Sequence, residues 1–137
     1  MKILALDLGD VWTGIALSDS LRMFARPYQT VKTTDLHNFL EALFKEENIT
    51  IIVVGFPKTL KGGHSEQTKK VVTHKELLEK NFPLFEWVLW DERLTSKQAQ
   101  TIKKPKEDKL KTHSIAAALI LETYLMHLQL QKVKEEE

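Results

Sequence analysis

Acidic residues at the ends of two apolar runs are the side chains in this sequence best placed to do chemistry. Asp7 comes directly after the run Ile3–Leu6, and Asp91 and Glu92 come directly after an aromatic and β-branched run. Both runs predict buried strands. A carboxylate at the end of a buried strand is costly unless a cation or hydrogen-bond donors receive it, and carboxylates that converge without a cation repel one another. The pattern therefore favours a divalent-cation site.

These acidic residues also have structural interpretations. Asp7 could cap the turn that follows it through an Asx-type hydrogen bond. Asp91 and Glu92 could be ordinary acidic residues favoured by a helix dipole, with Arg93 as their surface partner. The repeated placement of carboxylates at strand ends favours the site over these alternatives.

Lysines cluster in two segments that could contact phosphate. The segment 97–111 is polar, contains Pro105 and is expected to be a poorly ordered loop, with its candidate phosphate contacts at Lys103, Lys104 and Lys106. A solvated connection is the structural alternative for such a charge run. Lys58 lies in a glycine-bounded loop after a strand, where α/β proteins place ligands, but the Gly-Lys-Ser/Thr ending of a phosphate-binding P-loop is missing.

Bulk composition limits the class of protein. The 137 residues suit a single domain spanning 1–137, and the absence of cysteine excludes disulfide scaffolds and zinc-thiolate sites. No apolar run approaches the ~20 residues of a membrane span, and the first residues do not resemble a signal peptide. We expect a cytoplasmic protein without a membrane partner. A net charge of +1 neither requires nor excludes nucleic acid.

The order of the expected elements defines an α/β fold. Three antiparallel strands lead to a helix, a parallel strand, a second helix, another parallel strand and closing helices. This is the ribonuclease H-like order, a five-stranded mixed sheet with helices on both faces. The predicted strands cover 2–7, 14–19, 28–31, 50–54 and 85–90. The predicted helices start after caps at residues 33–35, at Ser65, at Thr95 with Gln98, and at Thr112 or Ser114, and the last one ends near Gln131 before a frayed tail at 132–137.

Four sequence blocks carry a resemblance to a known family. They are Asp7-Leu-Gly with Gly14-Ile-Ala-Leu-Ser-Asp, Val54-Gly-Phe-Pro with Gly62, Asp91-Glu-Arg-Leu-Thr, and Ile115-Ala-Ala with Leu119-Ile-Leu and Tyr124-Leu. Together they resemble the YqgF family of Holliday-junction-resolvase-like proteins, the pre-16S rRNA nucleases. The resemblance covers almost the whole chain.

The resemblance implies a two-metal nuclease site with Mg²⁺ or Mn²⁺. Its early Asp and its Glu map to Asp7 and Glu92, which we expect within reach of a common ion because adjacent parallel strands would bring them together. His113 stands where the family has a third acidic ligand, and Asp108 lies five residues earlier. Arg93 could pair with a phosphate or orient the carboxylates. The first hairpin has Val11 and Trp12 where the family has basic residues, and Trp12 could stack on a base or simply pack.

The implied function is metal-dependent hydrolysis of phosphodiester bonds in structured nucleic acid, for maturation of the 5′ end of pre-16S rRNA during ribosome biogenesis. Ribosomal particles are possible partners. One alternative is a domain with weakened catalytic activity that binds nucleic acid, or assists ribosome assembly, without cutting. Another is a Holliday-junction resolvase. The opening also resembles the phosphate loop of sugar-kinase ATPases, but those enzymes use two such domains. The residues leave the choice between RNA and DNA, and the oligomeric state, open.

Overall fold

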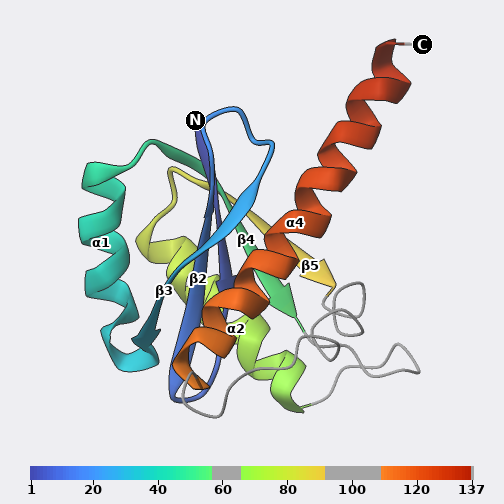
Figure 1. Cartoon of the computed structure of the whole chain (residues 1–137). Coiled ribbons are helices and arrows are strands. Elements are labelled where there is room, and N and C mark those ends of the chain that lie inside the picture. The colour runs from blue at the N-terminus through green and yellow to red at the C-terminus, as the bar shows by residue number, and fades with distance from the viewer. Residues whose placement is uncertain (57–65, 92–108, 137) are drawn as a thin grey trace.

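The chain folds around a mixed five-stranded sheet. The computed structural model describes residues 1–56, 66–91 and 109–136, and all elements below lie in these ranges. The strands pair in the order β3-β2-β1-β4-β5, with β1 antiparallel to β2 and parallel to β4 (Figure 1). The strands are β1 (Lys2–Asp7), β2 (Trp12–Ser18), β3 (Ala25–Lys32), β4 (Ile49–Phe56) and β5 (Glu86–Asp91). The helices are α1 (Leu36–Glu46), α2 (Glu66–Asn81) and α4 (Lys109–Glu136), and a 3₁₀ turn (Thr33–Asp35) precedes α1. The predicted fold class is confirmed.

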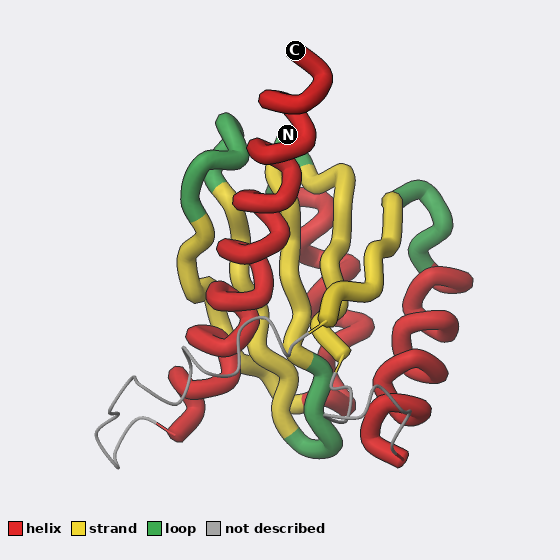
Figure 2. The backbone as a smooth tube through the Cα atoms, turned by 90° about the vertical axis from the view of Figure 1, so that its right-hand side faces the viewer, coloured by secondary structure: helices red, strands yellow, loops and turns green. Residues whose placement is uncertain are grey.

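Helices cover both faces of this sheet and create two cores (Figure 2). Alternate residues of a strand point to opposite faces. Leu4 and Leu6 pack toward α1 and α2, whereas Ile3 and Ala5 pack toward α4. The central strand β1 is therefore buried on both faces, as its uninterrupted apolar run predicts.

The last helix differs from the prediction at both ends. Within the described residues α4 begins at Lys109, so Lys109–Lys111 belong to the helix and not to the predicted basic loop. Thr112 and Ser114 consequently lie inside the helix, and the Ser114 hydroxyl donates to the Lys111 carbonyl instead of capping the first turn. At its other end α4 continues to Glu136, five residues beyond the predicted end, and stands clear of the sheet (Figure 1). No helix in the described ranges has the length and apolarity needed to cross a membrane.

The first helix begins directly after residues 33–35, as predicted, but without the predicted side-chain cap. The residue before α1 is Asp35, and neither it nor the residue before the 3₁₀ turn makes a side-chain cap. The Thr33 hydroxyl donates instead to the Gly9 carbonyl, at 2.7 Å. The strand β3 extends from Ala25, three residues before its predicted start, because it pairs with the whole of β2. The predicted caps at Ser65, Thr95 and Gln98 lie outside the described residues.

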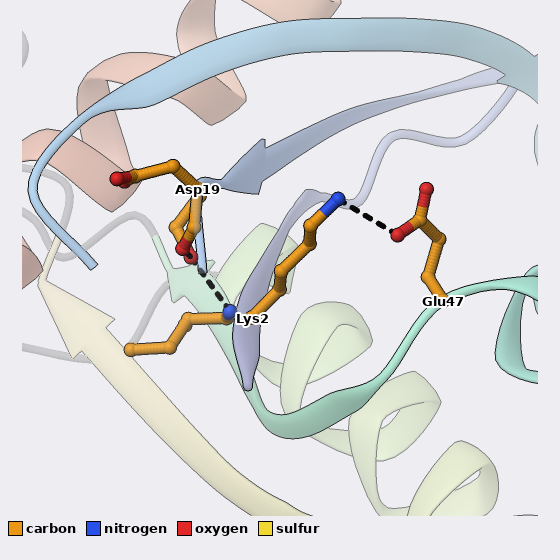
Figure 3. A network of polar contacts seen from close by, with 5 residues as sticks. Lys2, Asp19 and Glu47 are labelled. Atoms are coloured by element: carbon orange, nitrogen blue, oxygen red, sulfur yellow. Dashed lines mark hydrogen bonds and ion pairs between the residues drawn. The ribbon is translucent and has the colours of Figure 1, made fainter. Parts of the chain in front are cut away.

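Polar contacts close the edge of the sheet at which β1 begins. The buried Ser18 hydroxyl accepts a hydrogen bond from the Ile3 backbone N–H at 2.8 Å. Lys2 forms an ion pair with Glu47, also at 2.8 Å (Figure 3). β1 ends at Asp7, at the opposite end of the sheet from these contacts.

Candidate metal and nucleic-acid site

A row of cross-strand neighbours places Asp7 between two glycines. Asp7 pairs with Gly14 of β2, and the register Leu6–Val54 makes Gly55 its next neighbour on β4. Gly55 in turn pairs with Trp90 of β5. Asp7 continues the alternation of Ile3 and Ala5, which pack toward α4, so this row lies on the face that α4 covers. Two side chains that would otherwise flank the carboxylate are absent from this row.

The first turns of α4 lie directly on Gly14. A Cβ atom added to Gly14 would be 1.9 Å from the His113 carbonyl oxygen and 2.7 Å from the Ser114 nitrogen. Only a residue without a side chain permits this approach. Because cross-strand partners lie about 5 Å apart between Cα atoms, Gly14 brings the His113 backbone close to Asp7. The Thr30 hydroxyl, opposite Gly14 on β3, donates to the Leu110 carbonyl and holds the same turns from the other side.

The helical phase places His113 on the flank of α4 that faces the centre of the sheet. Residues eleven positions apart lie on the same side of a helix, so His113 shares its side with Tyr124. The Tyr124 ring makes an edge-to-face contact with Trp90 of β5, with ring centroids 5.3 Å apart. His113 is partly exposed. The structure therefore brings together two of the predicted site residues, Asp7 and His113, on one face and at one edge.

The loop between β1 and β2 is fixed by hydrogen bonds from Thr33. The Thr33 N–H donates to the Val11 carbonyl, and its hydroxyl joins the Gly9 carbonyl to the Thr13 hydroxyl. Gly9 itself allows the chain to turn, because a Cβ there would be 2.3 Å from the Trp12 carbonyl oxygen. These contacts make the loop that follows Asp7 a rigid support for it.

Trp12 lies on the same face as Asp7. It is two residues before Gly14 on β2, is half-buried, and is not among the described side chains that pack in either core. This position is compatible with both roles that the sequence suggests for Trp12, which are packing against its neighbours and stacking on a base.

The remaining predicted site residues lie outside the described residues. They are Lys58, Glu92, Arg93, Lys103, Lys104 and Lys106. Within the described ranges, no three acidic or histidine side chains converge on a possible metal position. The two strands expected to bring Asp7 and Glu92 together are not adjacent, because β4 separates β1 from β5. Asp7 and Trp90 are thus two strand spacings apart, about 10 Å between Cα atoms.

The sequence pattern does not predict the roles of three residues of this site. Gly55 is the neighbour of Asp7 in β4, Thr30 binds the start of α4, and Thr33 binds the loop between β1 and β2 instead of capping a helix. The signal for Gly55 was present, since a glycine inside a strand marks a close backbone approach. The two threonines bind residues that are distant in the sequence, and a local sequence pattern cannot predict such contacts.

Two solved structures share this ribonuclease H-like fold. The chain superposes on Thermus thermophilus RuvC in complex with a Holliday junction substrate with a TM-score of 0.60 at 14% identity, covering 94% of this chain and 96% of that one. Fowlpox virus resolvase with Holliday junction DNA gives a TM-score of 0.51 at 14% identity, covering 93% and 99%.

Sequence comparisons identify the family. A family model described as RuvX, Holliday junction resolvase, matches residues 1–127. A protein of Dictyoglomus turgidum named "putative pre-16S rRNA nuclease" is 35% identical over 95% of this chain and 97% of its own length. A protein of the same name from Rubrobacter xylanophilus is 44% identical over 70% of this chain and 69% of its own length. The chain belongs to the RuvX (YqgF) family, and it is a nuclease.

Proposed function

We propose that the chain is a metal-dependent endonuclease whose site is built from Asp7, Glu92 and His113. The observation that carries this proposal is the row Gly14–Asp7–Gly55, with the start of α4 seated on Gly14. This row supports the proposal because Asp7 and the backbone of His113 lie near the end of the parallel strand β1, and α/β folds bind ligands at the ends of such strands.

The chemistry of the donors fits a divalent ion of the Mg²⁺ or Mn²⁺ type. Carboxylate oxygens are the ligands such hard cations prefer, and Asp7 is only partly buried, so its carboxylate can be reached from solvent. A bound pair of ions would activate a water molecule and stabilise the leaving oxygen of the phosphodiester. Asp7 and Glu92 would hold the ions, and the rigid Thr33-supported loop would keep Asp7 in place while they bind.

His113 changes the expected metal preference of this site. Imidazole is a poor ligand for Mg²⁺ and an acceptable one for Mn²⁺. The same side chain could instead accept a proton from the attacking water. We therefore expect stronger activity with Mn²⁺ than with Mg²⁺, and less Mg²⁺-supported activity than a carboxylate at this position would give.

Basic residues would supply the contacts to the substrate phosphates. Arg93 is proposed to pair with a phosphate, and Lys58, Lys103, Lys104 and Lys106 to bind the phosphate backbone beside the ions. Such contacts position the strand but do not select its sequence.

The substrate we propose is the precursor of 16S rRNA, cut near its 5′ end in the cytoplasm, on ribosomal particles or their precursors. The names of the full-length relatives support this proposal. Branched DNA is the second candidate, because the matching family model carries the description of a Holliday junction resolvase.

One experiment tests both substrates. Purified protein is incubated with labelled pre-16S RNA fragments and with a four-way DNA junction, in Mg²⁺, in Mn²⁺ and in EDTA, beside Asp7→Asn. We expect RNA cleavage with Mn²⁺ that EDTA and Asp7→Asn abolish. Cleavage of the junction alone would select the resolvase. Binding of RNA without cleavage under any metal condition would refute the proposed metal site and favour a domain that acts on RNA by binding.

A further inference from the structure

One face of α2 forms a hollow beside the loop that follows Asp7. Its volume is about 470 Å³, and its lining residues fall at the three- and four-residue spacings of a single helix side. They are Glu66, Lys69, Lys70, Thr73, His74 and Leu77. None of them contributes to the site proposed above.

An ion pair fixes this hollow relative to the candidate site. The Lys70 ammonium lies 3.8 Å from the Asp10 carboxylate, in the loop between β1 and β2. Asp10 is three residues after Asp7, so their Cα atoms can be at most about 11 Å apart. The hollow therefore borders the edge of the sheet at which Asp7 lies, although α2 packs on the opposite face from α4.

The hollow presents donors suited to a phosphate. Lys69 and Lys70 are exposed, and Lys69 makes no ion pair within the described residues. The Thr73 hydroxyl can donate to the same oxygens, and His74, which is partly buried, adds a ring N–H. Glu66 at the start of α2 would repel a phosphate there, so the contact belongs to Lys69, Lys70 and Thr73. The exposed Leu77 extends the hollow with an apolar surface.

The loop after Asp7 lacks a cation of its own. It contains Asp10 and Val11, and Asp10 adds a negative charge near the path of any nucleic-acid strand that reaches Asp7. Lys70 neutralises Asp10 in the free protein. Because both partners are more than half exposed and 3.8 Å apart, this ion pair is weak and can be exchanged for a phosphate.

We propose that the α2 hollow, through Lys69, Lys70 and Thr73, binds the phosphate backbone of the nucleic-acid substrate a few nucleotides from the bond that is cut. This proposal rests on the proposed nuclease function and adds a second contact area on the other side of the sheet edge. When the substrate binds, Lys70 releases Asp10 and contacts a substrate phosphate instead. The negative charge of Asp10 therefore weakens substrate binding.

The test measures binding of a fluorescein-labelled RNA, a stem with a single-stranded arm, in EDTA so that no cleavage occurs. The dissociation constant is determined from 50 to 300 mM KCl. We expect the double variant Lys69→Gln, Lys70→Gln to bind several-fold more weakly at 0.1 M salt and to lower the log–log salt slope by about 1 to 2, one for each lost lysine contact. Lys80→Gln is the matched control, because Lys80 is exposed in the last turn of the same helix, outside the hollow. It should change neither quantity.

A second comparison isolates the exchange at Asp10. Asp10→Asn should tighten binding, and it should tighten it less when Lys70 is already Gln, because Asp10 then no longer competes with the phosphate for the Lys70 ammonium. Equal effects in both backgrounds would refute the exchange. An unchanged salt slope in the Lys69, Lys70 double variant, with cleavage in Mn²⁺ intact, would refute the α2 contact and leave the nuclease function standing. A protein that neither binds nor cuts any tested nucleic acid would refute both.

Discussion

Gly14→Ala is the substitution that most directly tests how the fold builds the site. The added methyl group would lie 1.9 Å from the His113 carbonyl oxygen, 1.5 Å short of the 3.4 Å at which ordinary van der Waals contact begins. All three of the nearest atoms belong to the backbone of α4, so no side chain can rotate away to relieve the clash. The first turn of α4 must therefore move off β2 by 1 Å or more, and His113 moves with it.

Gly14→Ala should reduce the cleavage rate strongly and the stability of the fold only moderately. Forcing a methyl group into a packed contact typically costs about 1–3 kcal/mol, less than the roughly 5–15 kcal/mol that stabilises a domain, so the variant should still fold. A displacement of about 1 Å in a catalytic group can cost about 100-fold in rate, equivalent to about 2.7 kcal/mol in the barrier. We expect kcat/KM for RNA cleavage with Mn²⁺ to fall about 100-fold while binding in EDTA changes little.

Leu43→Ala provides the matched control. Leu43 is buried in α1 on the opposite face, and its truncation should cost about 2–5 kcal/mol without moving α4. Urea unfolding measures both stabilities, and the cleavage assay is run at a temperature where both variants are folded. If Gly14→Ala cuts as fast as the parent protein, or if Leu43→Ala loses as much activity, the contact on Gly14 does not position the site.

Three further predictions concern the third ligand, a buried hydrogen bond and the pH dependence of stability. His113→Asp should raise Mg²⁺-supported cleavage and His113→Ala should lower Mn²⁺-supported cleavage; parental behaviour of both variants with both metals would make His113 structural. Ser18→Ala removes the acceptor of the buried Ile3 N–H and should cost about 1–3 kcal/mol in urea unfolding, whereas Ser20→Ala, at an exposed position, should stay within about 0.5 kcal/mol of the parent. Burial lowers the pKa of His74 below the usual 6.5 of a histidine, so the unfolded chain binds the proton more readily and stability should decline as pH falls below 6.5. His74→Gln should reduce that decline, and an identical pH profile would contradict it.

The sheet and the order of its elements could be predicted because each strand is a short apolar run with clear boundaries. The run Ile3–Leu6 predicts a strand buried on both faces, and the structure leaves all four residues fully buried. The helix spacing of Leu36, Leu40 and Leu43 likewise predicts their burial in α1. Local periodicity was sufficient for these elements.

The boundaries and contacts that were missed depend on distant parts of the chain. Lys109–Lys111 hold a single apolar residue between two lysines and give no apolar period, yet they are helical, and the first turns of α4 rest against Thr30 and Gly14. Thr33 has the residue type of a helix cap, but its hydroxyl contacts Gly9, twenty-four residues earlier. The lack of a side chain at Gly14 admits α4, a contact between residues about one hundred positions apart. Tertiary packing decides each of these cases.

The length of α4 offers a way to learn how the substrate is oriented. From His113 at the candidate site to the exposed Glu135, the helix rises about 33 Å along its axis, comparable to the range of fluorescence energy transfer between two dyes. The sequence contains no cysteine, so Glu135→Cys would create a single attachment point for a dye, far from the metal ligands. RNA labelled at its 5′ end and RNA labelled at its 3′ end would then give different transfer efficiencies, and the sign of that difference would give the direction in which the strand crosses the sheet.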